Sequence, residues 1–235
     1  TARIRTGLVE IPVLKALLSI LRAASLKWSH PLLRAVLDHP YLAIELDLQY
    51  IDAVARQGQV GSIGEWEERL AQLVAQLKSQ PNARGATSPS AAAAEETLVE
   101  FQRFRAVVDK LDTPHTEAEW IRITHQLMRG DVLGLQQRIC DPVDDDQWGI
   151  VRLDQEGLKQ AEILLNEWAG LEHGDCTLDI EAWYSLLSRT LKAEALDVPT
   201  KMQKGVQIQE AYDAALVPFR HTFLIHANDG EFPRR

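Results

Sequence analysis

Four aspartates in one short segment are the side chains with the clearest potential for metal chemistry. The segment is DPVDDDQWG, and its carboxylates belong to Asp141, Asp144, Asp145 and Asp146. Carboxylate oxygens are the ligands that hard divalent cations prefer. A calcium loop, however, needs alternating ligands, a central glycine and a closing glutamate, and this segment does not supply that arrangement. We therefore interpret it as a solvated acidic loop.

The histidines and cysteines are not spaced as zinc ligands. Neither an H-x-x-x-H pair nor a Cys-x-x-Cys pair is formed by the residues considered, which are His115, His125, His173, His221, His226, Cys140 and Cys176. His226 and Asp229 lie close enough in sequence for acid–base work. No nucleophile with a supporting base accompanies them, so a structural role is favoured. The sequence predicts no metal site and no catalytic residue.

Three glycines superficially suggest a phosphate-binding loop. Gly58, Gly61 and Gly64 are regularly spaced, but no strand pattern precedes them and no Lys-Ser/Thr pair follows Gly64. A P-loop requires both features, because its backbone N–H groups and its lysine bind the phosphates together. The sequence therefore predicts an ordinary loop here and no nucleotide-binding residue.

Composition and charge narrow the classes of function. The chain has 235 residues, enough for one or two domains, and a net charge of −9. A freestanding DNA-binding module is usually basic, so DNA contact would need a local patch. The basic groupings are Arg103, Arg105 and Lys110, and then Lys192, Lys201 and Lys204. With two cysteines, no membrane-length apolar run and no secretory signal pattern in residues 1–30, we expect a cytoplasmic protein without membrane association.

Apolar spacing predicts helices through most of the chain. They are expected over 11–24, from Ser29 to about 38, from Leu42 to Gly58, 62–77, 98–111, 116–130, from a cap at Asp154 to Trp168, and 180–191. Ser62-x-x-Glu65 and Thr116-x-x-Glu119 have the form of capping boxes. Residues 79–94 change to Ser, Pro, Asn, Gly and Ala, which predicts a mobile loop. The tryptophans fall mostly on apolar faces and are expected in the core.

The last part of the chain has a different pattern. Val206 and Ile208 alternate with glutamines, and Phe219 begins a second apolar run that continues to Ile225. The run is bounded by Pro218 and by the Asn228-Asp229-Gly230 turn, as a short buried strand often is. We therefore expect two strands at the end of a mainly α-helical chain, over Val206–Gln209 and Phe219–Ala227, packed on the first helix.

This stretch resembles the segment of UvrD/Rep-type DNA helicases that contains their fifth conserved motif. It is most similar to the version in AddB-type subunits of bacterial helicase–nuclease complexes, where the second strand reads like FDHVFVLGLNDGEFP. The residues that carry the resemblance are Phe219, His221, Phe223, Leu224, Asn228, Asp229, Gly230, Glu231, Phe232 and Pro233. The first two predicted helices are similar to the segment by which these helicases enter a helical insertion, called subdomain 2B.

The polar residues of the helicase motif are replaced in this chain. Glu210 and Tyr212 stand where the helicases have threonine and histidine, Ala215-Leu216 where they have lysine-glycine, and Pro218 where they have glutamate. The resemblance therefore implies the fold and lineage of a helicase without the chemistry of this motif. Phe219, Phe223, Asn228, Asp229, Gly230, Phe232 and Pro233 are expected to form a structural turn.

The resemblance implies three parts. Residues 1–28 would leave a helicase-like α/β motor domain through the first helix, 29–200 would form the helical insertion, and 201–235 would return to the motor domain. The chain would be a non-catalytic fragment of an ATP-dependent helicase–exonuclease subunit in double-strand-break repair and recombination. It would itself bind no cofactor, whereas its parent would use ATP and Mg²⁺.

The implied partners are DNA, bound through the parent, and a second helicase–nuclease subunit. Lys201 and Lys204 are the candidate DNA contacts, because they flank the helicase-like stretch. The alternative is a stand-alone helical protein-interaction module without a nucleic-acid function. Neighbouring coding sequence should distinguish the two, by the presence or absence of a nucleotide-binding loop or its relic and a nuclease domain.

Overall fold

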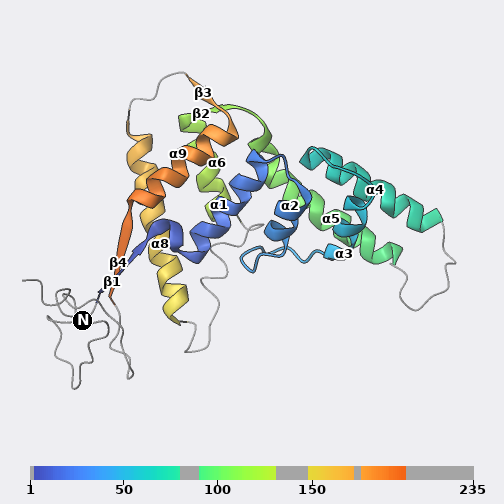
Figure 1. The fold of residues 1–235 in the computed structure, drawn as a ribbon, viewed down its shortest axis with the longest axis horizontal. Coiled ribbons are helices and arrows are strands. Elements are labelled where there is room, and N and C mark those ends of the chain that lie inside the picture. The colour runs from blue at the N-terminus through green and yellow to red at the C-terminus, as the bar shows by residue number, and fades with distance from the viewer. Residues whose placement is uncertain (1–2, 80–89, 131–147, 172–175, 200–235) are drawn as a thin grey trace, which may run out of the picture. The chain divides into compact units, whose positions relative to one another are not determined.

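The computed structural model describes residues 3–79, 90–130, 148–171 and 176–199, and in them the chain is mainly helical, as predicted. The elements, in chain order, are β1 (Arg3–Gly7), η1 (Leu8–Glu10), α1 (Pro12–Ser25), α2 (His30–Leu37), α3 (Leu48–Ala55), α4 (Ile63–Ser79), α5 (Ala91–Val108), η2 (Asp109–Asp112), β2 (His115–Thr116), α6 (Glu117–Arg129), α8 (Trp148–Ala169), β3 (Thr177–Leu178), α9 (Ile180–Ala193) and β4 (Ala195–Pro199). Figure 1 shows their arrangement.

Residues Thr6–Leu196 form one compact helical unit, and α1 is its central helix. Helix α1 packs against α2, α8 and α9, and most of its residues are buried. Pro12 begins the helix, where its missing N–H would have had no partner inside the helix. The other unit consists of Thr1–Arg5 and Asp197–Arg235 and lies largely outside the described residues.

Asp154 connects α8 to the first turn of α1. It was predicted to cap its own helix, and this is wrong, because α8 begins six residues earlier at Trp148. Its buried carboxylate instead accepts a hydrogen bond of 3.1 Å from the backbone N–H of Val13 and another from the Tyr41 hydroxyl. A free N–H at the start of one helix is therefore satisfied by a side chain of another helix.

A layer of tryptophans joins α6 to α9. Trp120 and Trp183 are both fully buried and stack with their ring centroids 6.0 Å apart. The Trp183 indole donates to the Thr124 hydroxyl at 3.1 Å, and the Trp120 indole donates to the Leu178 carbonyl at 2.9 Å. Trp28 and Trp66 are also buried and Trp168 is partly buried, so the prediction of core tryptophans is confirmed for these five.

Helices α4 and α5 lie side by side in opposite directions (Figure 1). The beginning of α4 meets the end of α5 through an ion pair between Glu67 and Arg105, and the end of α4 meets the beginning of α5 through one between Lys78 and Glu95. The loop predicted over 79–94 was too long, because Ser79 and residues 91–94 are helical. Its remaining centre, 80–89, lies outside the described residues.

The helix starts predicted from local sequence have different outcomes. Thr116 and Glu119 form the predicted capping box with both of its hydrogen bonds. At α4, Ser62 accepts from the Glu65 N–H, but Glu65 accepts from the N–H of Gly61. Helix α3 begins at Leu48, so the predicted helical start at Leu42 is wrong. Leu42 is buried from an irregular segment, which apolar spacing alone does not distinguish from a helix.

The helical unit begins and ends at neighbouring points. The N–H of Leu8 donates to the carbonyl of Glu194 at 3.0 Å, and strand β1 pairs with strand β4. A second pair, β2 with β3, is antiparallel and joins the start of α6 to the start of α9. These short strands were missed in the sequence. The strands predicted over Val206–Gln209 and Phe219–Ala227 lie outside the described residues.

Candidate functional site

The residues predicted to form sites lie outside the part of the chain that the structure describes. This holds for Lys201, Lys204 and the whole turn Phe219, Phe223, Asn228, Asp229, Gly230, Phe232 and Pro233. The acidic loop 141–146, which was interpreted as solvated, also lies outside the described residues. Their roles remain predictions. The candidate site below is therefore built from residues of the helical unit.

A groove of about 490 Å³ runs between the end of α1 and the outer face of α9. Its lining residues are Arg22, Ser25, Leu26, Glu181, Tyr184, Ser185, Ser188, Arg189 and Lys192. On α9 they recur every three to four positions and so share one face of the helix. The opposite face of α9 buries Trp183, Leu187 and Leu191 in the core, and this packing fixes the groove wall.

The charge of the groove is predominantly positive. Arg22, Arg189 and Lys192 contribute three cations against the single carboxylate of Glu181. Within the described part of the chain, none of these three cations has a carboxylate within ion-pair distance. All three are exposed, so their charges are open to a ligand.

The end of α1 is held rigidly beside this groove. The N–H of Trp28 donates to the Ala23 carbonyl at 2.7 Å, and the N–H of Lys27 donates to the Ala24 carbonyl at 3.0 Å. This pattern is a Schellman motif, which requires a left-handed residue after the helix. Lys27 supplies it with φ of 55°, and Trp28 follows with φ of 54°. A lysine and a tryptophan adopt this conformation at some cost, so the surrounding packing must impose it.

Buried contacts of Trp28 supply that packing. Its ring is fully buried and meets Phe104 edge-on, with centroids 5.8 Å apart. Its carbonyl accepts from the Trp66 indole at 2.9 Å, and its own indole donates to Asp112 at 3.3 Å. Burial raises the pKa of the Asp112 carboxyl. The end of α1, and Arg22 and Leu26 with it, is thereby tied to α4 and α5.

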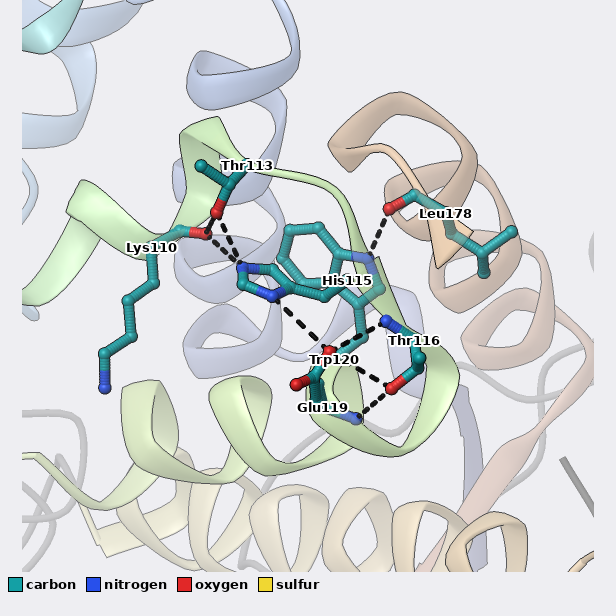
Figure 2. Close-up of polar contacts among 7 residues, drawn as sticks. All are labelled: Lys110, Thr113, His115, Thr116, Glu119, Trp120 and Leu178. Atoms are coloured by element: carbon teal, nitrogen blue, oxygen red, sulfur yellow. Dashed lines mark hydrogen bonds and ion pairs between the residues drawn. The ribbon is translucent and has the colours of Figure 1, made fainter. Parts of the chain in front are cut away.

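A second constellation contains the residue types of a catalytic triad. Figure 2 shows the His115 ring between Thr113 and Glu119, with the Thr113 hydroxyl 3.0 Å from Nε2 and the Glu119 carboxylate 3.7 Å from Nδ1. The carbonyl of Lys110, however, is only 2.8 Å from Nε2 and can only accept, so Nε2 carries the proton. His115 therefore cannot take a proton from Thr113 through that nitrogen.

The other contacts of this cluster fit a structural role. The Glu119 carboxylate is engaged by the backbone N–H of Thr116, and this hydrogen bond lowers its pKa. The His115 ring meets Trp120 edge-on at 5.0 Å. The cluster ties η2 to the start of α6 and to β3, and its geometry does not provide an activated nucleophile.

A second hollow, of about 480 Å³, lies over the irregular segment before α3 and is lined by residues 37–40, 42 and 44–48. It includes the carboxylates of Asp38, Glu45 and Asp47. Among the described residues, no three acidic, histidine or cysteine side chains are grouped closely enough to bind a metal ion. In the same part of the chain, no helix has the length and apolar character to cross a membrane.

The basic groupings named from the sequence have different outcomes. Arg103 pairs with Glu100 and Arg105 with Glu67, so this face of α5 is a set of internal ion pairs. Lys192 lines the groove. The partners of Lys192 in the groove, Arg22 and Arg189, were missed, because each is a single arginine in an ordinary helix and only the packing of α1 on α9 brings them together.

Comparisons with known proteins found no match. No protein-family model, no curated protein and no solved structure is significantly similar to this chain.

Proposed function

We propose that this chain is the helical insertion of an ATP-dependent DNA helicase–exonuclease subunit of the AddB type, acting in double-strand-break repair and recombination. The insertion would shape the path of DNA and contact a second helicase–nuclease subunit. ATP and Mg²⁺ would be used by the parent or by its partner. Catalysis would lie outside this chain.

The observation that carries the proposal is the closeness of the two ends of the helical unit. Leu8 and Glu194 share a backbone hydrogen bond of 3.0 Å, and β1 pairs with β4. A domain inserted into another domain has to leave and rejoin it at nearby points, because otherwise the host fold would be pulled apart. The helical unit of Thr6–Leu196 meets this requirement, and the resemblance of the stretch after it to a helicase segment supplies the identity of the host.

The polar groups replaced in that stretch support a structural role for this segment. Coupling of nucleotide hydrolysis to DNA requires a hydroxyl or a cation that reaches a phosphate oxygen. It also requires a glycine, whose lack of a Cβ lets the backbone approach the phosphate closely. Ala215, Leu216 and Pro218 offer neither. The apolar and turn residues that remain can pack and turn the chain.

The test is the coding sequence on both sides of these 235 residues. The proposal expects an upstream segment with a nucleotide-binding loop or its relic, and a downstream nuclease domain. A reading frame without either would contradict it and would favour the alternative, a helical protein-interaction module. If the chain is such an interaction module, the purified chain should capture no helicase–nuclease subunit.

A further inference from the structure

The groove between α1 and α9 differs from the α4–α5 pair in how its cations are used. All four basic residues on α4 and α5 form ion pairs, namely Arg69, Lys78, Arg103 and Arg105. In the groove, Arg22, Arg189 and Lys192 converge from two helices without a carboxylate partner among the described residues. Like charges in one groove repel one another, and a bound anion would relieve that repulsion.

Neutral donors line the same groove. Tyr184, Ser185 and Ser188, which carry hydroxyl groups, are among its lining residues, and Ser188 is buried. The Ser25 hydroxyl is already used, because it donates to the Arg22 carbonyl at 2.9 Å. Guanidinium groups with hydroxyls are the usual partners of phosphate oxygens in nucleic-acid complexes.

The groove also has apolar surface between its charges. Leu26 is 50 % exposed although it is a large apolar residue, and Tyr184, a half-buried residue, also lines the groove. Single-stranded nucleic acids are bound by positively charged grooves that contain an aromatic ring for base stacking. Packed helix axes are about 8–10 Å apart, so a groove between two of them suits one strand better than a duplex.

We propose that this groove binds a single strand of nucleic acid, with Arg22, Arg189 and Lys192 on its phosphates and Tyr184 against a base. The inference rests on the proposed function, because it assigns a contact for the parent's DNA substrate. It differs from the sequence prediction of Lys201 and Lys204 in using residues of the helical unit.

Binding of a fluorescent oligothymidine to the full chain, followed by anisotropy at about 50 mM salt, tests the proposal. Low salt is required because a net charge of −9 opposes a polyanion. The variant R22Q/R189Q/K192Q should bind at least about tenfold more weakly. The matched control R69Q/K78Q/R103Q removes the same charge from paired positions and should change affinity by less than about twofold. Circular dichroism establishes that both variants are folded.

Two further experiments test whether the ligand is a nucleic acid: substitution of Tyr184 and competition with other anions. Tyr184→Phe should keep binding and Tyr184→Ser should weaken it, because only the ring stacks on a base. Inorganic phosphate and polyglutamate should displace the oligonucleotide only at large excess. Three results would each overturn the proposal. They are an equal loss of oligonucleotide affinity in both triple variants, displacement of the oligonucleotide by polyglutamate at equal charge, and no binding by the unaltered chain. None of these results would alter the coding-sequence test, so failure of the groove and failure of the proposed function are separable.

Discussion

Helices α4 and α5 and helices α1 and α9 form two antiparallel pairs that use the same residue types differently. Between α4 and α5, cations meet carboxylates across the pair, as Arg105 does with Glu67 and Lys78 with Glu95. Between α1 and α9 the exposed cations line a groove, and Arg22 and Arg189 have no carboxylate partner among the described residues. In the first pair charge serves the fold, and in the second it is left for a ligand.

The two pairs also show that charge count alone is a poor guide to binding. Arg103 and Arg105 stand close together in the sequence and form the denser basic cluster, yet both are neutralised locally. Arg22 and Arg189 are isolated in sequence and meet only because α1 packs on α9. An unpaired charge in a concave surface is therefore the more informative signal.

The largest expected effect separates the two faces of α9. Trp183→Ala should lower the free energy of unfolding by about 3–5 kcal/mol, because the indole is fully buried, stacks on Trp120 and donates to Thr124. Arg189→Gln, on the groove face of the same helix, should change it by less than about 0.5 kcal/mol. Urea unfolding of both variants measures this. A comparable loss in Arg189→Gln would show that the groove face is structural.

The next effect concerns the buried carboxylate that supports the start of α1. Asp154→Ala should cost about 2–4 kcal/mol, because the Val13 N–H and the Tyr41 hydroxyl both lose the carboxylate acceptor. Asp154→Asn keeps an oxygen for Val13 and removes the charge, so at neutral pH it should lie within about 1 kcal/mol of the natural chain.

The pH dependence of this pair has a defined sign. Burial raises the pKa of Asp154 above that of an exposed aspartate, so the folded chain holds this proton more tightly than the unfolded chain. The natural chain should therefore lose stability relative to Asp154→Asn as pH rises from about 4, until the carboxyl is ionised in the folded state. Urea unfolding between pH 4 and 8 measures the difference. If the natural chain instead gained stability relative to Asp154→Asn as pH rises, the raised pKa of Asp154 would be contradicted.

The smallest effect tests the ion pairs between α4 and α5. Arg105→Gln should cost about 0.2–1 kcal/mol, because its partner Glu67 is only partly exposed but the pair remains near solvent. The same substitution should leave oligonucleotide binding unchanged within about twofold. Thermal unfolding and anisotropy check the two expectations. If Arg105→Gln weakened oligonucleotide binding as much as the groove variant does, the α4–α5 and α1–α9 pairs would not differ in their use of charge.

Much of the helical fold could be predicted from apolar spacing and capping residues. The features that could not be predicted share one cause. Helix α6 has a complete capping box and an apolar stripe, and both were recognised. Asp154 has the residue type of a helix cap, but its hydrogen bond goes to Val13, 141 positions away. The pairing of β1 with β4 and the groove between α1 and α9 likewise depend on packing between distant segments, which sequence spacing does not encode.

The salt dependence of oligothymidine binding tests the central claim, that the groove holds cations for phosphates, most directly. For a single strand, the slope of log K against log salt concentration is about −0.7 for each phosphate neutralised. Removing Arg22, Arg189 and Lys192 should therefore reduce the magnitude of the slope by about two. The R69Q/K78Q/R103Q control should keep the slope of the natural chain. An unchanged slope in the groove variant, or an equal reduction in the control, would contradict the account.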